Sequence, residues 1–338
     1  MEPWFACIRL LCYIEEAFLI GRSEAMVYCP KHSLSRRQML QATTLGISGL
    51  ILGKSAYGET VRATSGDHVQ EPLWDEGLTI TVGPDKADVV GLTDRAIQAA
   101  VDYVVRLGGG TVRILPGTYR LRNSIFLRKG VRLLGSGDAA VLFKEASHET
   151  IVTGDSDWFD QEVTLKNADG FRVGDGVMLE TKNPHHGGLD VLRRTLVARS
   201  GNRFKLDKAL RNNFWAQMTP TVSSRFPMIT AENESAMVIE NLVLDGNRAN
   251  NANVNGNYGG ALWFQDCENM LFKGLEIHDY NGDGISFQIC HDVNVENCRL
   301  LNNTDLGIHP GSGSKRPIIK NNIVKGSNVG LFFCWGVM

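Results

Sequence analysis

The sequence predicts an all-β solenoid, in which the chain winds through stacked coils over much of its 338 residues. Glycines that begin short alternating segments recur at spacings of 24, 23 and 23 residues, and a second alternating strand follows in each complete coil. A period near this length, with short strands and turn residues, is typical of a β-solenoid. The four segments are "GALWF" at Gly260, "GISFQ" at Gly284, "GIHPG" at Gly307 and "GLFFC" at Gly330.

The second strands of the coils share a corner position. They read "MLFKGLEI", "VNVENCRL" and "PIIKNNIV", after an earlier copy "MVIENLVLDGN". Stacked coils lie about 4.8 Å apart, so a side-chain amide at this corner can reach the backbone of the next coil. Alignment places Gly274 with three asparagines, and we interpret Asn241, Asn297 and Asn321 as a structural ladder.

Residues 1–58 read as an upstream extension followed by an export signal. Residues 35–58, "SRRQMLQATTLGISGLILGKSAYG", join Arg36–Arg37 to a weakly apolar stretch and small residues. This order resembles a twin-arginine signal, which implies the twin-arginine export machinery as a partner and a periplasmic or extracellular location. Because export signals begin near the start of a chain, Met26 is an alternative start to Met1.

The charge balance and the absence of long apolar runs narrow the class of protein. The 35 basic and 37 acidic residues leave no broad nucleic-acid footprint. No apolar run beyond the signal is long enough to span a membrane, so we expect no stable membrane insertion after processing. We also expect the protein to be a monomer.

Two cysteines fall at equivalent positions of consecutive coils. Cys267 and Cys290 stand 23 residues apart, and stacking would bring them to a distance that suits a disulfide. The favoured alternative is a ladder of buried thiols.

The order of the remaining elements defines one main body. Residues 59–85 read as a linker, and Thr93 is a good N-cap for a helix with an apolar stripe. Strands follow at "TVRIL", "SIFLR" and "GVRLLGSG". Residues 150–230 form twisted hairpins that we interpret as a β-rich insertion in a body spanning 86–338.

The helix, "GGGTV", "PGTYRL" and coils of the form "GISFQICHDVNVENCRLLNN" resemble the pectate lyase-like superfamily over roughly 86–148 and 230–338. The resemblance implies a right-handed parallel β-helix capped by an N-terminal α-helix. Superfamily members include polysaccharide lyases, polygalacturonase-like hydrolases, epimerases and tailspike-type binders. The polygalacturonase catalytic set does not transfer, because "NNTDLGIH" supplies Asn-Thr-Asp but the paired aspartates and Gly-His-Gly are missing.

Alternation along the coils predicts one candidate site. The residue after each repeat glycine should face inward and the next one outward, which makes Ser286 and His309 neighbours on an outer face. Other chemistry-bearing residues flank these strands on adjacent coils. The band consists of Tyr280, Asp283, Ser286, His291, Asp305, His309, Lys315 and Arg316.

The band suits a carbohydrate acid. In a lyase, His309 or Lys315 would remove the proton beside the carboxylate, and Asp283 and Asp305 are candidate calcium ligands. In a hydrolase, Asp283 and Asp305 would be acid and base. Substrate contacts are assigned to Tyr280, Ser286, His291, Lys315 and Arg316, of which the basic pair could hold uronate or sulfate groups. Trp263 is interpreted as a core residue, with sugar stacking as the alternative.

The sequence therefore predicts an exported protein that acts on an acidic, uronate-containing polysaccharide, with a lyase favoured over a polygalacturonase-like hydrolase. A non-catalytic glycan-binding or surface β-helix is the competing class. Calcium is the only candidate cofactor that the sequence suggests. The chain stops at "GLFFCWGVM", one strand into a new coil, which we interpret as a truncated reading frame or a fragment.

Overall fold

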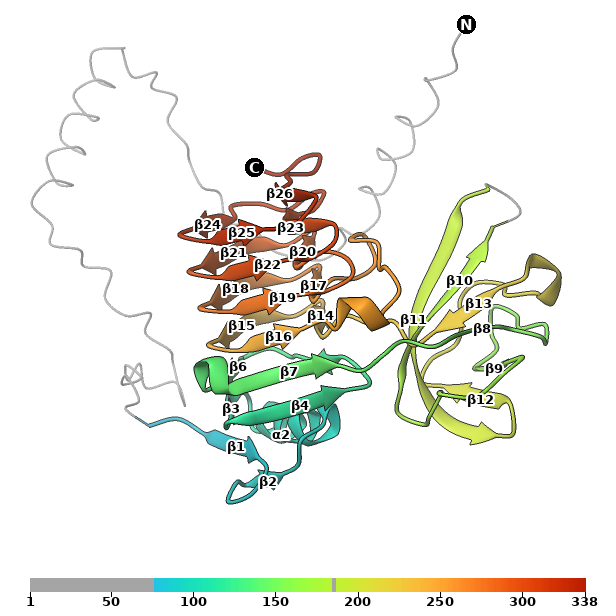
Figure 1. Ribbon diagram of the computed structural model, residues 1–338, viewed down its shortest axis with the longest axis horizontal. Coiled ribbons are helices and arrows are strands. Elements are labelled where there is room, and N and C mark those ends of the chain that lie inside the picture. Colours follow the sequence, from blue (N-terminus) through green and yellow to red (C-terminus); the bar gives the residue numbers. More distant parts are fainter. Residues whose placement is uncertain (1–75, 184–186) are drawn as a thin grey trace, which may run out of the picture. The chain divides into compact units, whose positions relative to one another are not determined.

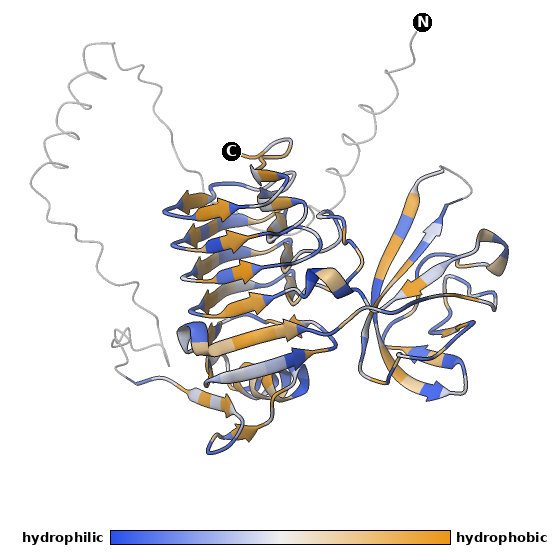
Figure 2. Cartoon of the chain, in the orientation of Figure 1, coloured by the Kyte–Doolittle hydropathy of each residue, from blue (hydrophilic) through white to orange (hydrophobic). Residues whose placement is uncertain are grey.

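The computed structural model describes residues 76–183 and 187–338, which form a stack of coils and a separate antiparallel sheet (Figure 1). The proposed export signal lies outside the described residues. Within those residues, no helix is both long and apolar enough to cross a membrane. Apolar residues concentrate on the strands of the stack, and polar residues concentrate at the corners between them (Figure 2).

Three parallel sheets make up the stack, so the predicted parallel β-helix is confirmed. The first sheet runs β2 (Val89–Val90), β1 (Thr79–Gly83), β3 (Gly110–Ile114), β6 (Val131–Leu134), β15 (Ser235–Glu240), β18 (Glu268–Lys273), β21 (His291–Glu296) and β24 (Ile318–Lys320). The second runs β26 (Val329–Leu331), β23 (Leu306–Pro310), β20 (Ile285–Gln288), β17 (Leu262–Gln265), β14 (Ile229–Glu232) and β5 (Ile125–Phe126). The third runs β25 (Ile323–Lys325), β22 (Arg299–Leu301), β19 (Glu276–His278), β16 (Val243–Asp245), β7 (Ala140–Lys144) and β4 (Gly117–Leu121).

Helix α2 (Asp94–Arg106) packs against the first coils of the stack, as the sequence predicts. Thr93 occupies the N-cap position with an extended backbone, although its side chain makes no capping hydrogen bond. Ile97, Val101 and Val104 are fully buried and belong to the same apolar core as the inward residues of the coils. The helix therefore shields the apolar interior of the first coils from water.

In the observed pairing of coils, the first position of the repeat is Ala261, one residue later than the predicted Gly260. Ile285 pairs with Ile308 and Ile308 pairs with Leu331, so Gly284, Gly307 and Gly330 do stack. Leu262 pairs with Ile285, which places Ala261, and not Gly260, in that column. A Cβ at Gly307 would come within 2.5 Å of the Gly330 carbonyl oxygen, so glycine is needed there for the close approach of two coils.

Two boundaries differ from the predicted ones. The expected linker 59–85 contains β1, because Thr79–Val82 pair with Thr111–Ile114 of β3. The expected insertion 150–230 ends earlier, because β14 pairs with both β5 and β17 and is part of the stack.

The insertion is an antiparallel sheet with its own apolar core. Its core includes Phe171, Leu179, Leu196 and Phe204. Its strands follow the order β8 (Glu149–Ile151), β13 (Thr221–Ser223), β10 (Gly176–Lys182), β11 (Leu189–Ser200), β12 (Arg203–Leu206) and β9 (Glu162–Thr164). Three short 3-10 turns complete the described elements: η1 (Gly137–Ala139), η2 (Ala216–Met218) and η3 (Arg248–Asn250).

The predicted asparagine ladder has a different physical basis from the expected one. Asn241, Asn297 and Asn321 are exposed and have φ angles of 53°, 55° and 57°, as Gly274 does at 61°. Their shared corner needs a left-handed backbone, which asparagine and glycine adopt at low cost. The recurrence of asparagine or glycine at this corner therefore reflects the backbone conformation and not an amide-to-backbone ladder.

Amide bonds between coils do occur, at other asparagines. Asn303 is fully buried, donates to the Ile277 carbonyl at 3.0 Å and accepts from the Tyr280 N–H at 3.0 Å. Asn322 makes the same two kinds of bond, with the Val295 carbonyl and the Cys298 N–H.

The cysteines of the described coils are free. Cys267, Cys290 and Cys298 are buried, and burial raises the pKa of the Cys298 thiol to about 11. A side-chain hydrogen bond with Cys267, together with burial, raises the pKa of the Cys290 thiol. The structure therefore contains the thiol ladder rather than a Cys267–Cys290 disulfide.

Replacing Asn303 by alanine should lower the free energy of unfolding by about 3 kcal/mol, because it leaves the buried Tyr280 N–H and Ile277 carbonyl unpaired. Urea unfolding followed by circular dichroism measures the change. Asn297→Gly is the matched control and should stay within about 0.5 kcal/mol of the wild type, since glycine also adopts the left-handed corner. Equal losses in the two variants would contradict this assignment.

Candidate functional site

The outer face of the second sheet carries a row of side chains from successive coils. Thr230 pairs with Trp263, Trp263 with Ser286, and Ser286 with His309. The residues just before them, such as Ile285, point into the core of the stack. The prediction that Ser286 and His309 are neighbours on one outer face is therefore confirmed.

The upper half of this row is covered. The Ser286 hydroxyl donates to the Gly256 carbonyl at 2.7 Å, so the loop before β17 lies across it. His309 is 4% exposed, and its imidazole meets the Phe332 ring edge-on with centroids 5.8 Å apart. The expectation that a polysaccharide contacts Ser286 here is wrong for this arrangement, because chain segments outside the repeat pattern occupy the space.

The two predicted catalytic aspartates, Asp283 and Asp305, have different hydrogen-bond partners. Asp283 is buried: its Oδ1 accepts the Leu306 N–H at 3.0 Å, and its Oδ2 lies 2.7 Å from His309 Nδ1. Asp305 instead accepts a hydrogen bond from the Asn253 amide at 2.9 Å. Both Asp283 oxygens are already bonded, so this carboxylate does not fit a calcium ligand.

No wider metal cluster compensates for this. In the part of the chain that the structure describes, no group of three or more histidine, cysteine, aspartate or glutamate side chains could hold a metal ion.

The predicted substrate-binding residues do not form one surface. Tyr280 is buried, and its hydroxyl donates to the Phe226 carbonyl at 3.0 Å, so it is structural. His291 begins β21 of the first sheet, on another side of the coil from His309. Arg316 makes a two-point ion pair with Asp292 at 2.7 Å, and Lys315 donates to the Gly336 carbonyl.

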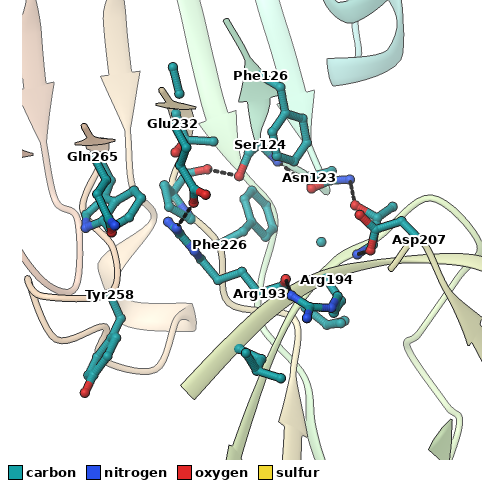
Figure 3. A pocket seen from close by; sticks show the side chains of 18 of the residues that line it. Asn123, Ser124, Phe126, Arg193, Arg194, Asp207, Phe226, Glu232, Tyr258 and Gln265 are labelled. Atoms are coloured by element: carbon teal, nitrogen blue, oxygen red, sulfur yellow. Dashed lines mark hydrogen bonds and ion pairs between the residues drawn. The ribbon is translucent and has the colours of Figure 1, made fainter. Parts of the chain in front are cut away.

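A cavity of about 580 Å³ lies lower on the same outer face, between the second sheet and the insertion (Figure 3). One wall comes from β5, β14 and β17, and the opposite wall from β11 and the start of the segment after β12. Polar and aromatic side chains point into it, including Glu232, Gln265, Arg193 and Asp207. Pockets of this size, with a few convergent polar groups, are the usual form of a ligand site.

Three side chains of the cavity lining carry a buried polar atom without a hydrogen-bond partner. Of the six buried side-chain nitrogen and oxygen atoms that lack a hydrogen-bond partner in the described residues, three belong to its lining. They are Arg193 Nη1, Trp263 Nε1 and Thr230 Oγ1. A buried polar group without a partner costs about 1–3 kcal/mol, so three such atoms on the lining of one cavity call for an explanation.

Arg193 is the central cation of the cavity. Its guanidinium lies 3.5 Å from the centre of the Trp263 ring, and its Nη2 bonds Glu232, which leaves Nη1 free. Burial lowers the pKa of Arg193 to about 10, so the side chain is still charged at neutral pH. The contact with Trp263 and the bond to Glu232 hold the guanidinium in place, and Nη1 is left buried without a hydrogen-bond partner.

The neighbouring charged groups are held by the protein itself. Arg194 donates to the carbonyls of Ala209 and Leu210, and burial lowers its pKa. Asp207 accepts the Thr195 N–H at 2.8 Å. Figure 3 shows the Tyr258 ring at the cavity's edge, with its hydroxyl directed away from Arg193.

The sequence-based search missed Arg193, Thr230 and Glu232. Arg193 lies in the insertion, which no repeat connects to the coils, and only the docking of β11 brings it to Trp263. Trp263 is buried, as expected, but on the outer face under Arg193. Its place in the same outward row as Ser286 follows only from the observed register, because the predicted register put Leu262 there.

Sequence and structure comparisons agree with the fold. A family profile described as a right handed beta helix region matches residues 222–335. The chain is a right-handed parallel β-helix protein, and this is the class that its architecture defines. No curated protein sequence matches the chain.

Among solved structures, the chain is similar to a protein of Parabacteroides merdae ATCC 43184 that is provisionally named a glycosyl hydrolase, at 15% identity and a TM-score of 0.38 over 72% of this chain and 87% of that chain. It is similar to the A-module of a mannuronan C-5 epimerase of Azotobacter vinelandii, at 16% identity and a TM-score of 0.39 over 70% of this chain and 54% of that chain. The tailspike protein gp49 of Pseudomonas phage LKA1 matches at 14% identity and a TM-score of 0.27 over 71% of this chain and 48% of that chain. The chain thus spans about half the length of the epimerase module and of the tailspike, and similarity at this level carries no argument on function.

Replacing Thr230 by valine should raise the free energy of unfolding by about 1 kcal/mol, because it removes a buried hydroxyl without a partner and keeps the shape of the side chain. Thermal and urea unfolding measure the effect. Thr81→Val is the matched control: its hydroxyl bonds Asp88 at 2.7 Å, so the same change there should lower stability. A loss of stability at Thr230 would mean that the hydroxyl is not an unfilled ligand contact.

Proposed function

We propose that this protein is a carbohydrate-active protein that binds an acidic, uronate-containing glycan in the cavity between the second sheet and the insertion. The observation that carries the proposal is that three side chains lining one cavity each have an unpaired polar atom: Arg193 Nη1, Trp263 Nε1 and Thr230 Oγ1. Two of them are N–H donors and the third is a hydroxyl that can donate. A carboxylate offers about four acceptor positions on two oxygens, which suits such a set.

The cavity also suits the rest of a sugar unit. Phe126 and Tyr258 line it and are partly exposed, so apolar ring faces are available beside the polar groups. Gln265 and Asn257 add amides that can bond hydroxyls. A mixture of aromatic faces and a few placed polar groups fits a hydroxylated acid better than an apolar ligand.

The reaction that we favour is β-elimination, the polysaccharide lyase reaction. Removal of the proton next to a uronate carboxylate leaves negative charge on that carboxylate, and a fixed cation with two further donors stabilises it. The base must lie close to the carboxylate, and Glu232 is the carboxylate bonded to Arg193 in the cavity. Glu232 is therefore the candidate base, in place of His309 and Lys315, which do not line the cavity.

A glycoside hydrolase is the second candidate. Glu232 comes from β14 and Asp207 from the opposite wall, so the cavity holds two carboxyl groups on different sides. Such a pair is the requirement for acid and base in glycoside hydrolysis. Elimination creates a double bond that absorbs in the ultraviolet, whereas hydrolysis does not, so the absorbance of the products separates the two reactions.

Export through the twin-arginine machinery to the periplasm or beyond is part of the same proposal. It rests on residues 35–58, and N-terminal sequencing of the mature protein tests it.

Arg193→Gln should weaken the binding of an oligouronate at least tenfold, because a charge-assisted hydrogen bond contributes about 1.5–3 kcal/mol. Isothermal titration with oligogalacturonate and oligomannuronate measures the affinity. Arg203→Gln is the matched control in the same insertion: Arg203 pairs with Glu162 on the exposed surface, and its loss should leave the affinity unchanged. Equal effects of the two changes would argue against a carboxylate site at Arg193.

Glu232→Gln should keep oligouronate affinity within about threefold and reduce the formation of unsaturated product at least 100-fold, since a general base contributes about 10²–10⁴ to a rate. The absorbance of the reaction mixture follows turnover. Glu162→Gln, which alters an arginine–glutamate pair outside the cavity, should leave turnover unchanged. Binding without turnover in the wild type would identify a glycan-binding β-helix instead of an enzyme.

A further inference from the structure

A chain of three titratable side chains crosses the top of the stack, outside the cavity. Asp283 Oδ2 lies 2.7 Å from His309 Nδ1, and His309 Nε2 lies 3.0 Å from the sulfur of Cys334. The three residues come from three successive coils, 26 and 25 positions apart in sequence. Neither the repeat nor the cavity accounts for this alignment.

The surrounding hydrogen bonds define the tautomer of His309. Asp283 accepts the Leu306 N–H with its other oxygen, and the Ser286 hydroxyl gives its proton to the Gly256 carbonyl. Ser286 Oγ, at 3.3 Å, and Asp283 Oδ2 can therefore both act as acceptors toward Nδ1. Nδ1 carries the proton, and the lone pair of Nε2 faces the Cys334 thiol.

The main chain holds the thiol in this position. Cys334 N–H donates to the Pro310 carbonyl at 3.0 Å, and Phe332 N–H donates to the Ile308 carbonyl at 3.0 Å. These bonds continue the ladder of β23 into the segment that carries Cys334. Cys334 itself is partly exposed, unlike the three buried cysteines, so a small reagent can reach this residue.

The other thiols of the described coils lack this arrangement. Cys267, Cys290 and Cys298 are at most 2% exposed. Each directs its sulfur at a backbone carbonyl, as Cys298 does at Glu296, 3.3 Å away. The reactivity of these three thiols, which have no neighbouring base, can be compared with that of Cys334 in the same protein.

We propose that Asp283, His309 and Cys334 form a nucleophilic thiol site, in which Cys334 is a position of covalent modification by small, soft electrophiles. His309 acts as the base for the thiol, and Asp283 positions the imidazole and stabilises the imidazolium. With iodoacetamide as the probe, the sulfur–carbon bond forms as the carbon–iodine bond breaks. Iodide leaves with the bonding pair, and the thiol proton passes to His309 Nε2.

The site is independent of the glycan proposal. None of its three residues lines the cavity, so failure of either proposal leaves the other standing.

The test is the rate of carboxamidomethylation of each cysteine in the full-length native protein at pH 7, followed by peptide mass spectrometry. Cys334 should react at least tenfold faster than N-acetylcysteine under the same conditions. Cys298 should stay unlabelled until the protein is denatured. Peptide mapping separates these signals from the cysteines near the N-terminus.

His309→Ala should slow the labelling of Cys334 at least tenfold, and imidazole added to the buffer should restore part of the rate, which a purely structural role of His309 would not produce. The matched control is His278→Ala, which removes a histidine paired with Asp279 at 2.9 Å and should leave the rate unchanged. Circular dichroism confirms folding, and His309→Gln replaces the alanine variant if that variant does not fold. A wild-type rate no higher than that of N-acetylcysteine, or a rate that survives the loss of His309, overturns the proposal.

Discussion

The in-register pairing of successive coils is the constraint on which the rest of this structure depends. Ile285, Ile308 and Leu331 stack in one column, and every residue of a coil then stands above its counterpart about 4.8 Å away. Glycines 284, 307 and 330 allow this approach, since a Cβ at the first two would meet the carbonyl oxygen of the coil above. A shift of one residue would exchange the core and outer faces of a strand.

The same register turns distant residues into neighbours, and the chemistry follows from it. Thr230, Trp263, Ser286 and His309 form one outward row, but their surroundings differ. At the lower end, the insertion lies opposite the row and encloses a cavity. At the upper end, the loop before β17 and the segment around Cys334 cover the row directly.

The junction between the stack and the insertion contains an unusual amount of buried charge. Arg225 bonds Ser223, the Asn253 carbonyl and Glu180, while the buried Lys144 donates to Asn251 at 2.5 Å. Burial lowers the pKa of Lys144 to about 7. Removing one partner of a buried, bonded charge leaves the other uncompensated, so these contacts tie the insertion to the stack.

The sequence by itself determined the solenoid, its period, the capping helix and the neighbouring positions of Ser286 and His309, because each follows from a local pattern that repeats. It placed the first repeat member one residue early, since a glycine at 260 looks like the others when the pairing of Leu262 with Ile285 is not visible. It also attributed to Asn241, Asn297 and Asn321 a hydrogen-bonding role, where the left-handed corner is the cause. Only the tertiary structure decided which part of the outer row is open, because Arg193 and Cys334 reach that row through the docking of an insertion and of an adjoining segment, and no periodicity in the chain encodes those contacts.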